Sequence, residues 1–405
     1  MVRSLRRSTL PGTAALGCLL LLTACGHGGP APADAAPVRA AQAPALLPVP
    51  RGEGSEVPDD FNGDGHRDLL LDDLVKAQSH ADDAGIGIVY GSSRGLVPGT
   101  RQLLTPKRYA APTDGQSPAV FETEATCDLD GDGFTDPPPA PLAVPDRARL
   151  GNDWPERPVC GDFDGDGAQD LVVHASAGHL SYLRGPFTRK GAPREATAPL
   201  ASPGEAPTGP AADVNRDGYD DLVVRASAGP GKAYVVLGGP DGPTRTGATL
   251  PAGTDVALGA FGRGKALDAA VATASGTALR HDLPTAIPGT PSTLDTTAPT
   301  LHAADLDGDG LSELITADSG VRLLPGSATG PTTKGSVTLN PASKGTPQIL
   351  TAADFDGDGR ADLVLRTVRG ETTDTVEIHP GTATAALVTP KPSLTFSTSQ
   401  FLPHP

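Results

Sequence analysis

Short runs of alternating hydrophobic and polar residues recur along the chain, and they predict β-strands rather than helices. Residues 170–173 and 221–224 both read Asp-Leu-Val-Val, and residues 232–238 form a second kind of run that ends at a glycine. The chain of 405 residues contains 50 Gly and 42 Pro, which interrupt long helices. The pattern therefore predicts an all-β fold built from many short strands.

An acidic motif precedes these runs and recurs along the chain. Residues 60–69 read Asp-Phe-Asn-Gly-Asp-Gly-His-Arg-Asp-Leu. Further copies begin at Asp128, Asp162, Asp213, Asp305 and Asp354, and a degenerate copy begins at Ala260. The seven starts are on average 49 residues apart. A repeat of this length with about four short strands is typical of a propeller blade, so we expect a seven-bladed β-propeller.

The combined pattern resembles a known repeat family. Asp-x-Asp-x-Asp-Gly-x-x-Asp-Leu-Val, followed by Gly-x-Val-x-Val-x-x-Gly, is similar to the FG-GAP or VCBS-type repeat of integrin α-subunits and bacterial proteins. The resemblance covers about residues 55–390. It implies a seven-bladed propeller with a calcium ion in the loop between the first two strands of each intact blade. It also implies a ligand face formed by the loops opposite the calcium loops.

The loop chemistry agrees with a hard cation, which prefers six to eight oxygen ligands. Side chains at loop positions 1, 3, 5 and 9 and the carbonyl at position 7 can supply them, and Gly at position 6 allows the turn. The predicted ligands are Asp60, Asn62, Asp64, His66 and Asp68; Asp128, Asp130, Asp132, Phe134 and Asp136; Asp162, Asp164, Asp166, Ala168 and Asp170; Asp213, Asn215, Asp217, Tyr219 and Asp221; Asp305, Asp307, Asp309, Leu311 and Glu313; and Asp354, Asp356, Asp358, Arg360 and Asp362.

These six loops hold 22 of the 48 acidic residues, and such clusters repel one another strongly without a cation. Extracellular calcium modules often have dissociation constants near 10⁻⁴ M. At about 1 mM free calcium each site would contribute about 1.4 kcal/mol, and six sites about 8 kcal/mol. We therefore expect about six structural Ca²⁺ ions.

Two repeats depart from the pattern. The fifth has Ala260, Gly262, Gly264 and Lys265 at motif positions, so it should bind no ion, and Arg263 or Lys265 should pair with the remaining Asp268. The second loop is followed by three prolines at 137–139, and the third loop begins only 34 residues after the second. The second blade should therefore be short or irregular.

The N-terminal segment has the features of a secretory signal. Three arginines precede an apolar run at 14–22, which is too short to cross a bilayer, and the sequence Leu-Thr-Ala-Cys ends at Cys25. This ending resembles a bacterial lipobox, which implies lipidation of Cys25; the alternative is an ordinary signal cut near Ala24. The predicted organisation is a signal peptide at 1–24, an Ala/Pro-rich tether at 25–54, the propeller at 55–397 and a tail at 398–405.

Removal of residues 1–24 changes the net charge from −16 to −19, which argues against a nucleic-acid partner. Export would place Cys127 and Cys160 in an oxidising compartment, where they form either a disulfide or two buried free thiols. The Ala-, Pro- and Arg-rich composition is typical of actinobacteria, so we expect a lipid-anchored, extracytoplasmic protein.

The expected function is a binding or adhesion module for an extracellular protein or polysaccharide. No catalytic constellation stands outside the metal loops, so the sequence does not predict an enzyme. Two alternatives remain open: a polysaccharide lyase or hydrolase on a propeller scaffold, and a structural subunit of an envelope complex.

Overall fold

The computed structural model describes residues 45–402, apart from 82–83, 110–122, 124, 137–155, 176–178, 227–229, 263, 265, 282, 285–291 and 342. The chain divides into two units, Met1–Ala41 and Gln42–Pro405. The predicted signal peptide and Cys25 lie outside the described residues. The propeller belongs to the second unit.

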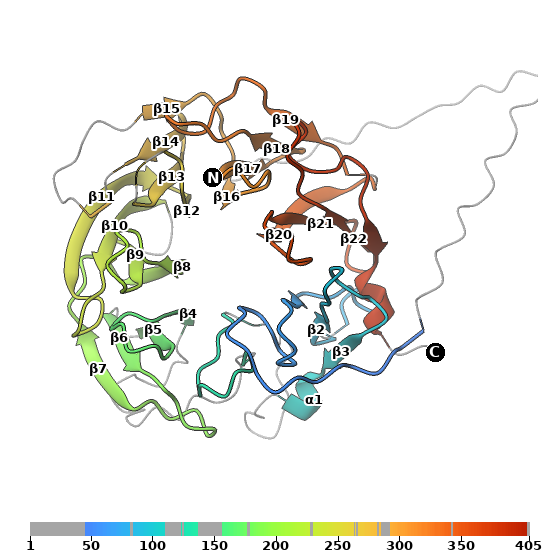
Figure 1. Ribbon diagram of the computed structural model, residues 1–405, viewed down its shortest axis with the longest axis horizontal. Helices are drawn as coiled ribbons and strands as arrows, with labels where there is room; N and C mark the ends of the chain where they lie inside the picture. Colours follow the sequence, from blue (N-terminus) through green and yellow to red (C-terminus); the bar gives the residue numbers. More distant parts are fainter. Residues whose placement is uncertain are drawn as a thin grey trace, which may run out of the picture. The chain divides into compact units, whose positions relative to one another are not determined.

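The described strands form six antiparallel sheets around a ring (Figure 1). Five sheets have four strands each, joined in sequence order: β4 (Glu156–Gly161), β5 (Asp170–Ala175), β6 (His179–Arg184) and β7 (Glu195–Leu200); β8 (Ala206–Ala212), β9 (Asp221–Arg225), β10 (Gly231–Leu237) and β11 (Arg245–Gly253); β12 (Asp255–Gly259), β13 (Asp268–Thr273), β14 (Gly276–Arg280) and β15 (Ser292–Leu294); β16 (Thr300–Ala304), β17 (Glu313–Ala317), β18 (Val321–Leu324) and β19 (Val337–Leu339); and β20 (Thr346–Ala353), β21 (Asp362–Val368), β22 (Asp374–His379) and β23 (Leu394–Phe396). The sheet of the first repeat has three strands, β1 (Leu69–Leu71), β2 (Ile86–Val89) and β3 (Arg101–Leu104). The described helical segments are α1 (Pro106–Tyr109) and the 3₁₀ helix η1 (Thr398–Phe401), so the fold is an all-β propeller, as predicted.

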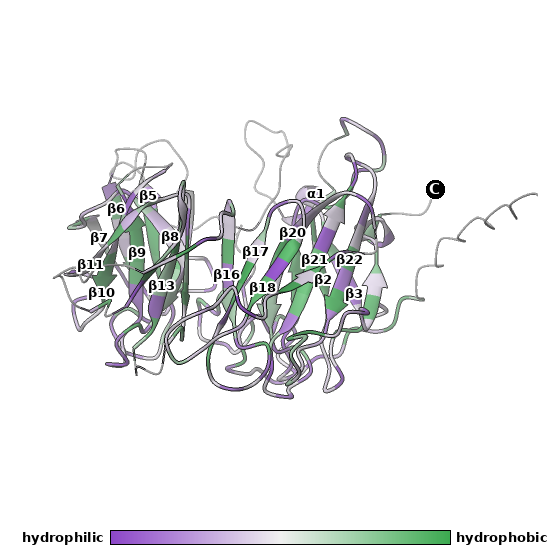
Figure 2. Cartoon of the chain, turned by 90° about the horizontal axis from the view of Figure 1, so that it is seen from above, coloured by the Kyte–Doolittle hydropathy of each residue, from purple (hydrophilic) through white to green (hydrophobic). Residues whose placement is uncertain are grey.

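The core lies between neighbouring sheets, and hydrophobic residues are concentrated in the strands (Figure 2). In β5, Leu171 and Val173 pack against Cys127 on one side, whereas Val172 packs against Leu222 of β9 on the other. A central strand is thus buried on both faces, which explains its continuous apolar run. None of the described helices is long and apolar enough to cross a membrane.

Seven blades were predicted, the second of them short or irregular, whereas six sheets are present among the described residues. The second repeat contributes its acidic loop and an isolated bridge between Cys127 and Asp136. The short spacing to the third loop leaves few residues for strands, and residues 137–155 lie outside the described part.

The predicted C-terminal tail is part of the propeller. Thr398 is fully buried and Phe401 is 7% exposed, and η1 packs beside β3 and β22. Phe401 shares one hydrophobic cluster with Leu69 of the first repeat and Val376 of the last. The apolar residues of this segment therefore help to close the ring, and the domain extends beyond the predicted boundary at 397.

The predicted tether also differs at its C-terminal end. Leu47 donates its N–H to the carbonyl of Gly99 (2.8 Å), and Gly52 donates to Asn62 (2.9 Å). The Arg51 guanidinium lies 5.4 Å from the centre of the Phe134 ring. Residues 47–55, here called the N-terminal strap, are therefore bonded to the propeller loops.

Candidate metal centres in the blade loops

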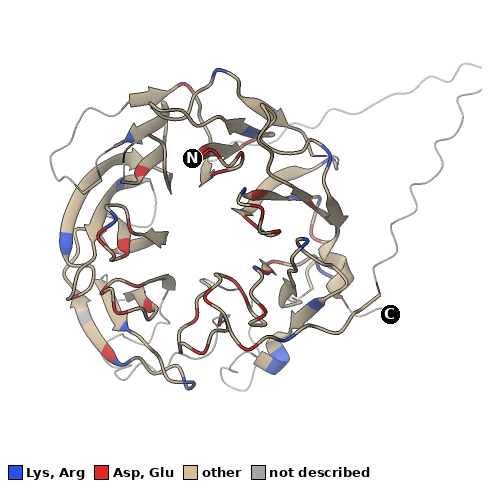
Figure 3. Ribbon diagram, viewed as in Figure 1, with Lys and Arg blue, Asp and Glu red and all other residues tan. Residues whose placement is uncertain are grey.

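The acidic loops at 162, 213, 305 and 354 join the first two strands of their sheets, as predicted, whereas the 60–68 loop precedes β1, the first described strand of its sheet. Figure 3 shows the Asp and Glu residues of these loops gathered toward the inner side of the ring. Asp60 accepts hydrogen bonds from the N–H groups of Gly63 (2.7 Å), Asp64 (3.2 Å) and Gly65 (2.7 Å). Both glycines have positive φ, 69° and 84°, which favours Gly, although Arg216 has φ 60° at the first of these positions in the 213–221 loop. The same type of turn is made by Asp128, Asp162, Asp213, Asp305 and Asp354.

The ninth-position acid joins its loop to the end of a more distant strand. Asp68 accepts hydrogen bonds from the N–H groups of Phe61 (2.8 Å) and Gly91 (2.7 Å), and Gly91 lies just beyond β2. Glu313 accepts in the same way from Leu306 (2.8 Å) and Gly326 (2.9 Å). Asp170, Asp221 and Asp362 make the equivalent bonds. These acids therefore have a structural role that ligand counting did not predict.

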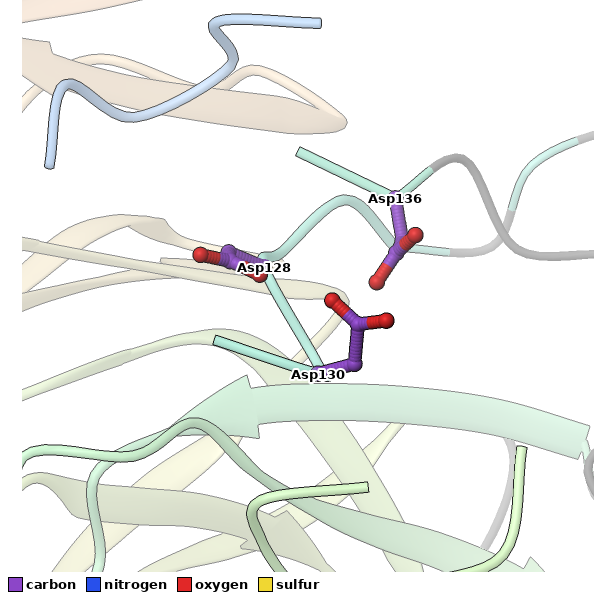
Figure 4. A group of neighbouring side chains, drawn as sticks. All are labelled: Asp128, Asp130 and Asp136. Atoms are coloured by element: carbon purple, nitrogen blue, oxygen red, sulfur yellow. The ribbon is translucent and has the colours of Figure 1, made fainter. Parts of the chain in front are cut away.

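Acids at positions 1, 3 and 9 come together in four loops, with one carboxylate oxygen of each within 4.8 Å of the others. Figure 4 shows one such group, in which Asp130 and Asp136 turn their carboxylates toward one another. The groups are Asp128, Asp130 and Asp136; Asp162, Asp164 and Asp170; Asp305, Asp307 and Glu313; and Asp354, Asp356 and Asp362. In the 60–68 and 213–221 loops position 3 is Asn, and no group of three acids forms among their described residues.

The fifth-position acids lie outside these groups, although they were predicted as ligands. Their carboxylates instead contact neighbouring side chains: Asp64 contacts Asn62, Asp132 contacts Arg189, Asp166 contacts Arg194, Asp217 contacts Arg245, and Asp358 contacts Arg360. Each fifth-position acid also accepts the N–H of the seventh residue: His66, Phe134, Ala168, Tyr219, Leu311 and Arg360. The ligand role of the seventh-position carbonyls stays a prediction.

Burial raises the pKa of the ninth-position acids. Desolvation raises the pKa of Asp68 to about 7, and the nearby Asp60 and Asp64 carboxylates add to the rise, although backbone N–H donors oppose it. Desolvation likewise raises the pKa of Asp221 and Glu313 to about 7, and that of Asp136, Asp170 and Asp362 to about 6. In the 128–136 loop, Asp130 Oδ1 is buried and accepts no hydrogen bond. Buried oxygens of this kind fit a hard divalent cation, so the four groups can hold a metal ion.

The fifth repeat lacks these acids, and its surviving Asp268 has a different partner. His281 Nδ1 lies 2.9 Å from Asp268 Oδ2. His281 directly follows β14, the place that Gly185 and Gly238 occupy after β6 and β10. The predicted partners Arg263 and Lys265 lie outside the described residues. His281 lies outside the acidic loop motif. Only its position directly after β14 could have indicated from the sequence that it contacts Asp268.

Backbone hydrogen bonds connect successive loops around the ring. At four junctions of the described chain the eighth-position N–H donates to the first-position carbonyl of the preceding loop, as from Thr135 to Asp60 (2.9 Å) and from Ala361 to Asp305 (2.8 Å). The second repeat and the degenerate fifth repeat both take part, since Ser312 donates to Ala260 (2.9 Å). No residue type marks these bonds, so the sequence could not show them.

Cys127 and Cys160 form a disulfide. Cys127 directly precedes the 128–136 loop, and Cys160 lies on β4 of the next repeat. Of the two states left open by the sequence, the structure contains the bonded one. The disulfide holds the second repeat beside a regular sheet.

Comparison with known proteins supports the repeat assignment. A model described as an FG-GAP-like repeat matches residues 305–365, and an FG-GAP repeat model matches residues 207–237. The chain carries FG-GAP-type repeats. The two matches cover the loops at 213, 305 and 354, which belong to three of the six described sheets.

Two solved structures that align with the chain are distant from it in sequence. A Photorhabdus luminescens Tc holotoxin pore aligns over 82% of the chain with 18% identity and a TM-score of 0.39, and the aligned part is 15% of the holotoxin chain. BBS1N, solved in complex with ARL6DN, aligns over 57% of the chain and 78% of its own length, with 12% identity and a TM-score of 0.35. No curated protein sequence matches the chain.

Proposed function

We propose that this protein is a seven-bladed, calcium-stabilised β-propeller that acts as an extracellular binding or adhesion module. The observation that carries the calcium assignment is the convergence of the same oxygen donors at the same place in four loops. The two Asn-containing loops share the turn geometry and bring the expected number of ions to about six. The seventh blade would be the second repeat, whose loop is bonded to the loop before it.

Calcium titration of the full-length protein by calorimetry, with melting followed in parallel, tests this assignment. We expect about six ions and a large fall in melting temperature after chelation. Asp307→Ala should remove one ion, because it deletes the third-position oxygen ligand and Asp307 belongs to one group only. Unchanged melting after chelation, together with no heat of binding, would refute the calcium assignment.

For the cellular role, we propose export, cleavage before Cys25 and lipid attachment to Cys25, which would hold the propeller at the outer surface of the membrane. Metabolic labelling with a fatty acid tests this step, and Cys25→Ala should abolish the label. The ligand would be a protein or polysaccharide bound by the loops opposite the calcium loops. The net charge of −16 supports a partner other than nucleic acid.

The proposal assigns no catalytic residue. Incubation with polysaccharides separates it from the enzyme alternative, because calcium-dependent turnover would support a lyase or hydrolase. Copurification with one stoichiometric envelope protein would support the structural-subunit alternative. Saturable binding of a polysaccharide without turnover, or of an extracellular protein, is the result expected of a binding module.

A further inference from the structure

Two guanidinium groups lie on the acids of the 162–170 loop. Arg184 Nε is 2.7 Å from Asp164 Oδ2. An Arg194 terminal nitrogen is 3.4 Å from the same Asp164 oxygen and 2.5 Å from Asp166 Oδ2. The Asp164 side chain is only 5% exposed, so its charge is largely removed from solvent. The carboxylate of Asp164, the third-position acid of this loop, thus has two cationic partners within the protein.

The strands hold both arginines in place. Arg184 is the last residue of β6, and the N–H of Arg194 donates to its carbonyl (2.9 Å). Arg184 also donates to the carbonyl of Pro240 in the next repeat (3.0 Å), and its guanidinium lies 5.6 Å from the centre of the Tyr182 ring. Because these contacts come from three directions, Arg184 is not a freely moving surface side chain.

The ninth-position acid of this loop also has an additional partner. The Tyr182 hydroxyl donates to Asp170 Oδ2 (2.7 Å), which also accepts the N–H of Phe163 (3.2 Å). The other oxygen of Asp170 accepts the N–H of Gly185 (2.7 Å). A cation that binds in this loop would therefore compete with the hydrogen bonds and ion pairs that the carboxylate oxygens of Asp164 and Asp170 already make.

The 305–313 loop provides the contrast within the same chain. Asp305, Asp307 and Glu313 converge as the acids of the 162–170 loop do. In the described part of the chain, no Lys, Arg or His forms an ion pair with any of these three acids.

We infer that the calcium sites are unequal: Arg184 and Arg194 make the 162–170 loop the weakest of the sites with three converging acids, and the 305–313 loop is the strongest. This inference rests on the proposed calcium binding. Two guanidinium groups near a divalent cation repel it and compete for the same oxygens. The arginines stabilise the 162–170 loop without an ion, whereas the 305–313 loop depends on one.

Calorimetric calcium titration of the full-length protein and of Arg184→Gln/Arg194→Gln tests the inference. The double variant should show one site that binds at least about tenfold more tightly, equal to about 1.4 kcal/mol of binding free energy. Adding Asp164→Asn to the double variant should remove the gain. Arg369→Gln/Lys344→Gln is the control, because it makes the same charge change at two exposed residues without ion pairs in the described structure.

The outcomes separate this inference from the calcium assignment. Calcium binding that is equal in the wild type and in Arg184→Gln/Arg194→Gln overturns the inference and leaves the assignment intact. No calcium binding by the wild type overturns both. Where the double variant does not fold, Arg194→Gln alone should show a smaller gain, since the Arg194 side chain is 46% exposed and tolerates replacement. Equal binding by this folded single variant would also overturn the inference.

Discussion

Closure of the ring depends on one buried carboxylate, and Asp374→Ala is the perturbation that tests it. Asp374 is the first residue of β22. Its carboxylate accepts hydrogen bonds from Arg366 Nε (2.8 Å) and the Ser397 hydroxyl (2.8 Å). It also accepts hydrogen bonds from the N–H (2.9 Å) and the hydroxyl (2.7 Å) of Thr398. Thr398 Oγ1 in turn accepts the N–H of Val75 in the first repeat (2.9 Å). Asp374 therefore connects the last sheet, the C-terminal segment and the first repeat.

The structure sets the size of the expected effect. Arg366 and Asp374 have side chains that are 4% and 0% exposed, so removing the acid leaves a buried cation. Breaking a buried ion pair by removing one partner costs about 3–5 kcal/mol. Arg366 keeps its bond to the Asp73 carbonyl (2.6 Å), which argues against a larger loss. We expect Asp374→Ala to lower the free energy of unfolding by about 3–5 kcal/mol, and Asp374→Asn by less, because the amide oxygen still accepts.

Urea unfolding followed by circular dichroism measures the difference. Glu371→Gln is the control, since Glu371 pairs with His80 at the surface, where the two side chains are 41% and 89% exposed. The control should keep the wild-type midpoint. A loss below about 1 kcal/mol for Asp374→Ala would show that the apolar cluster around Phe401, rather than the ion pair, closes the ring.

Three further predictions concern other parts of the propeller. Cys127→Ser should lower the free energy of unfolding by about 3–4 kcal/mol, because the disulfide spans 33 residues; thermal melting checks this, and reductant should no longer affect the variant. Phe134→Ala should speed tryptic cleavage after Arg51, because the ring holds this part of the N-terminal strap; mass spectrometry of the fragments checks the site. Without calcium, the folded protein should lose stability as pH rises from about 4.5 to about 7, because the ninth-position acids, such as Glu313, have raised pKa values and the folded state binds more protons than the unfolded state. Melting across this pH range checks the sign, and saturating calcium should reduce the loss.

The repeat spacing predicted most of the fold, because each loop motif marks the point between two strands. It predicted the places of the loops at 162, 213, 305 and 354 and the sheets around them. At the second repeat, which the spacing predicted to be short or irregular, the loop is present and no sheet is found among the described residues. A loop motif requires only local turn chemistry, whereas a four-stranded sheet also needs enough residues between successive loops.

Interactions across the hairpins were beyond the sequence pattern. The pairing of Asp268 with His281, like that of Asp164 with Arg184, joins residues 13 and 20 positions apart through strand geometry. A motif read position by position treats every acid as a ligand. In the folded chain the fifth-position acids instead contact Arg or Asn in most loops. Some of these partners lie in the same loop and others lie before or at the start of the fourth strand of a sheet, so the motif alone does not reveal them.

The ninth-position acid is best understood as a determinant of the fold before it is a ligand. Its two oxygens bind backbone N–H groups at both ends of a hairpin, and Glu313 makes both bonds with its longer side chain. The degenerate fifth loop separates the two roles, because it has lost the acids at positions 1, 3 and 5 but retains Asp268, which is 6% exposed. There the His281 side chain contacts the acid, with Nδ1 2.9 Å from Asp268 Oδ2. A bound metal is therefore not required to explain a buried acid at the ninth position. The third-position acids have no such backbone role between strands. Their substitution should therefore report metal binding most directly.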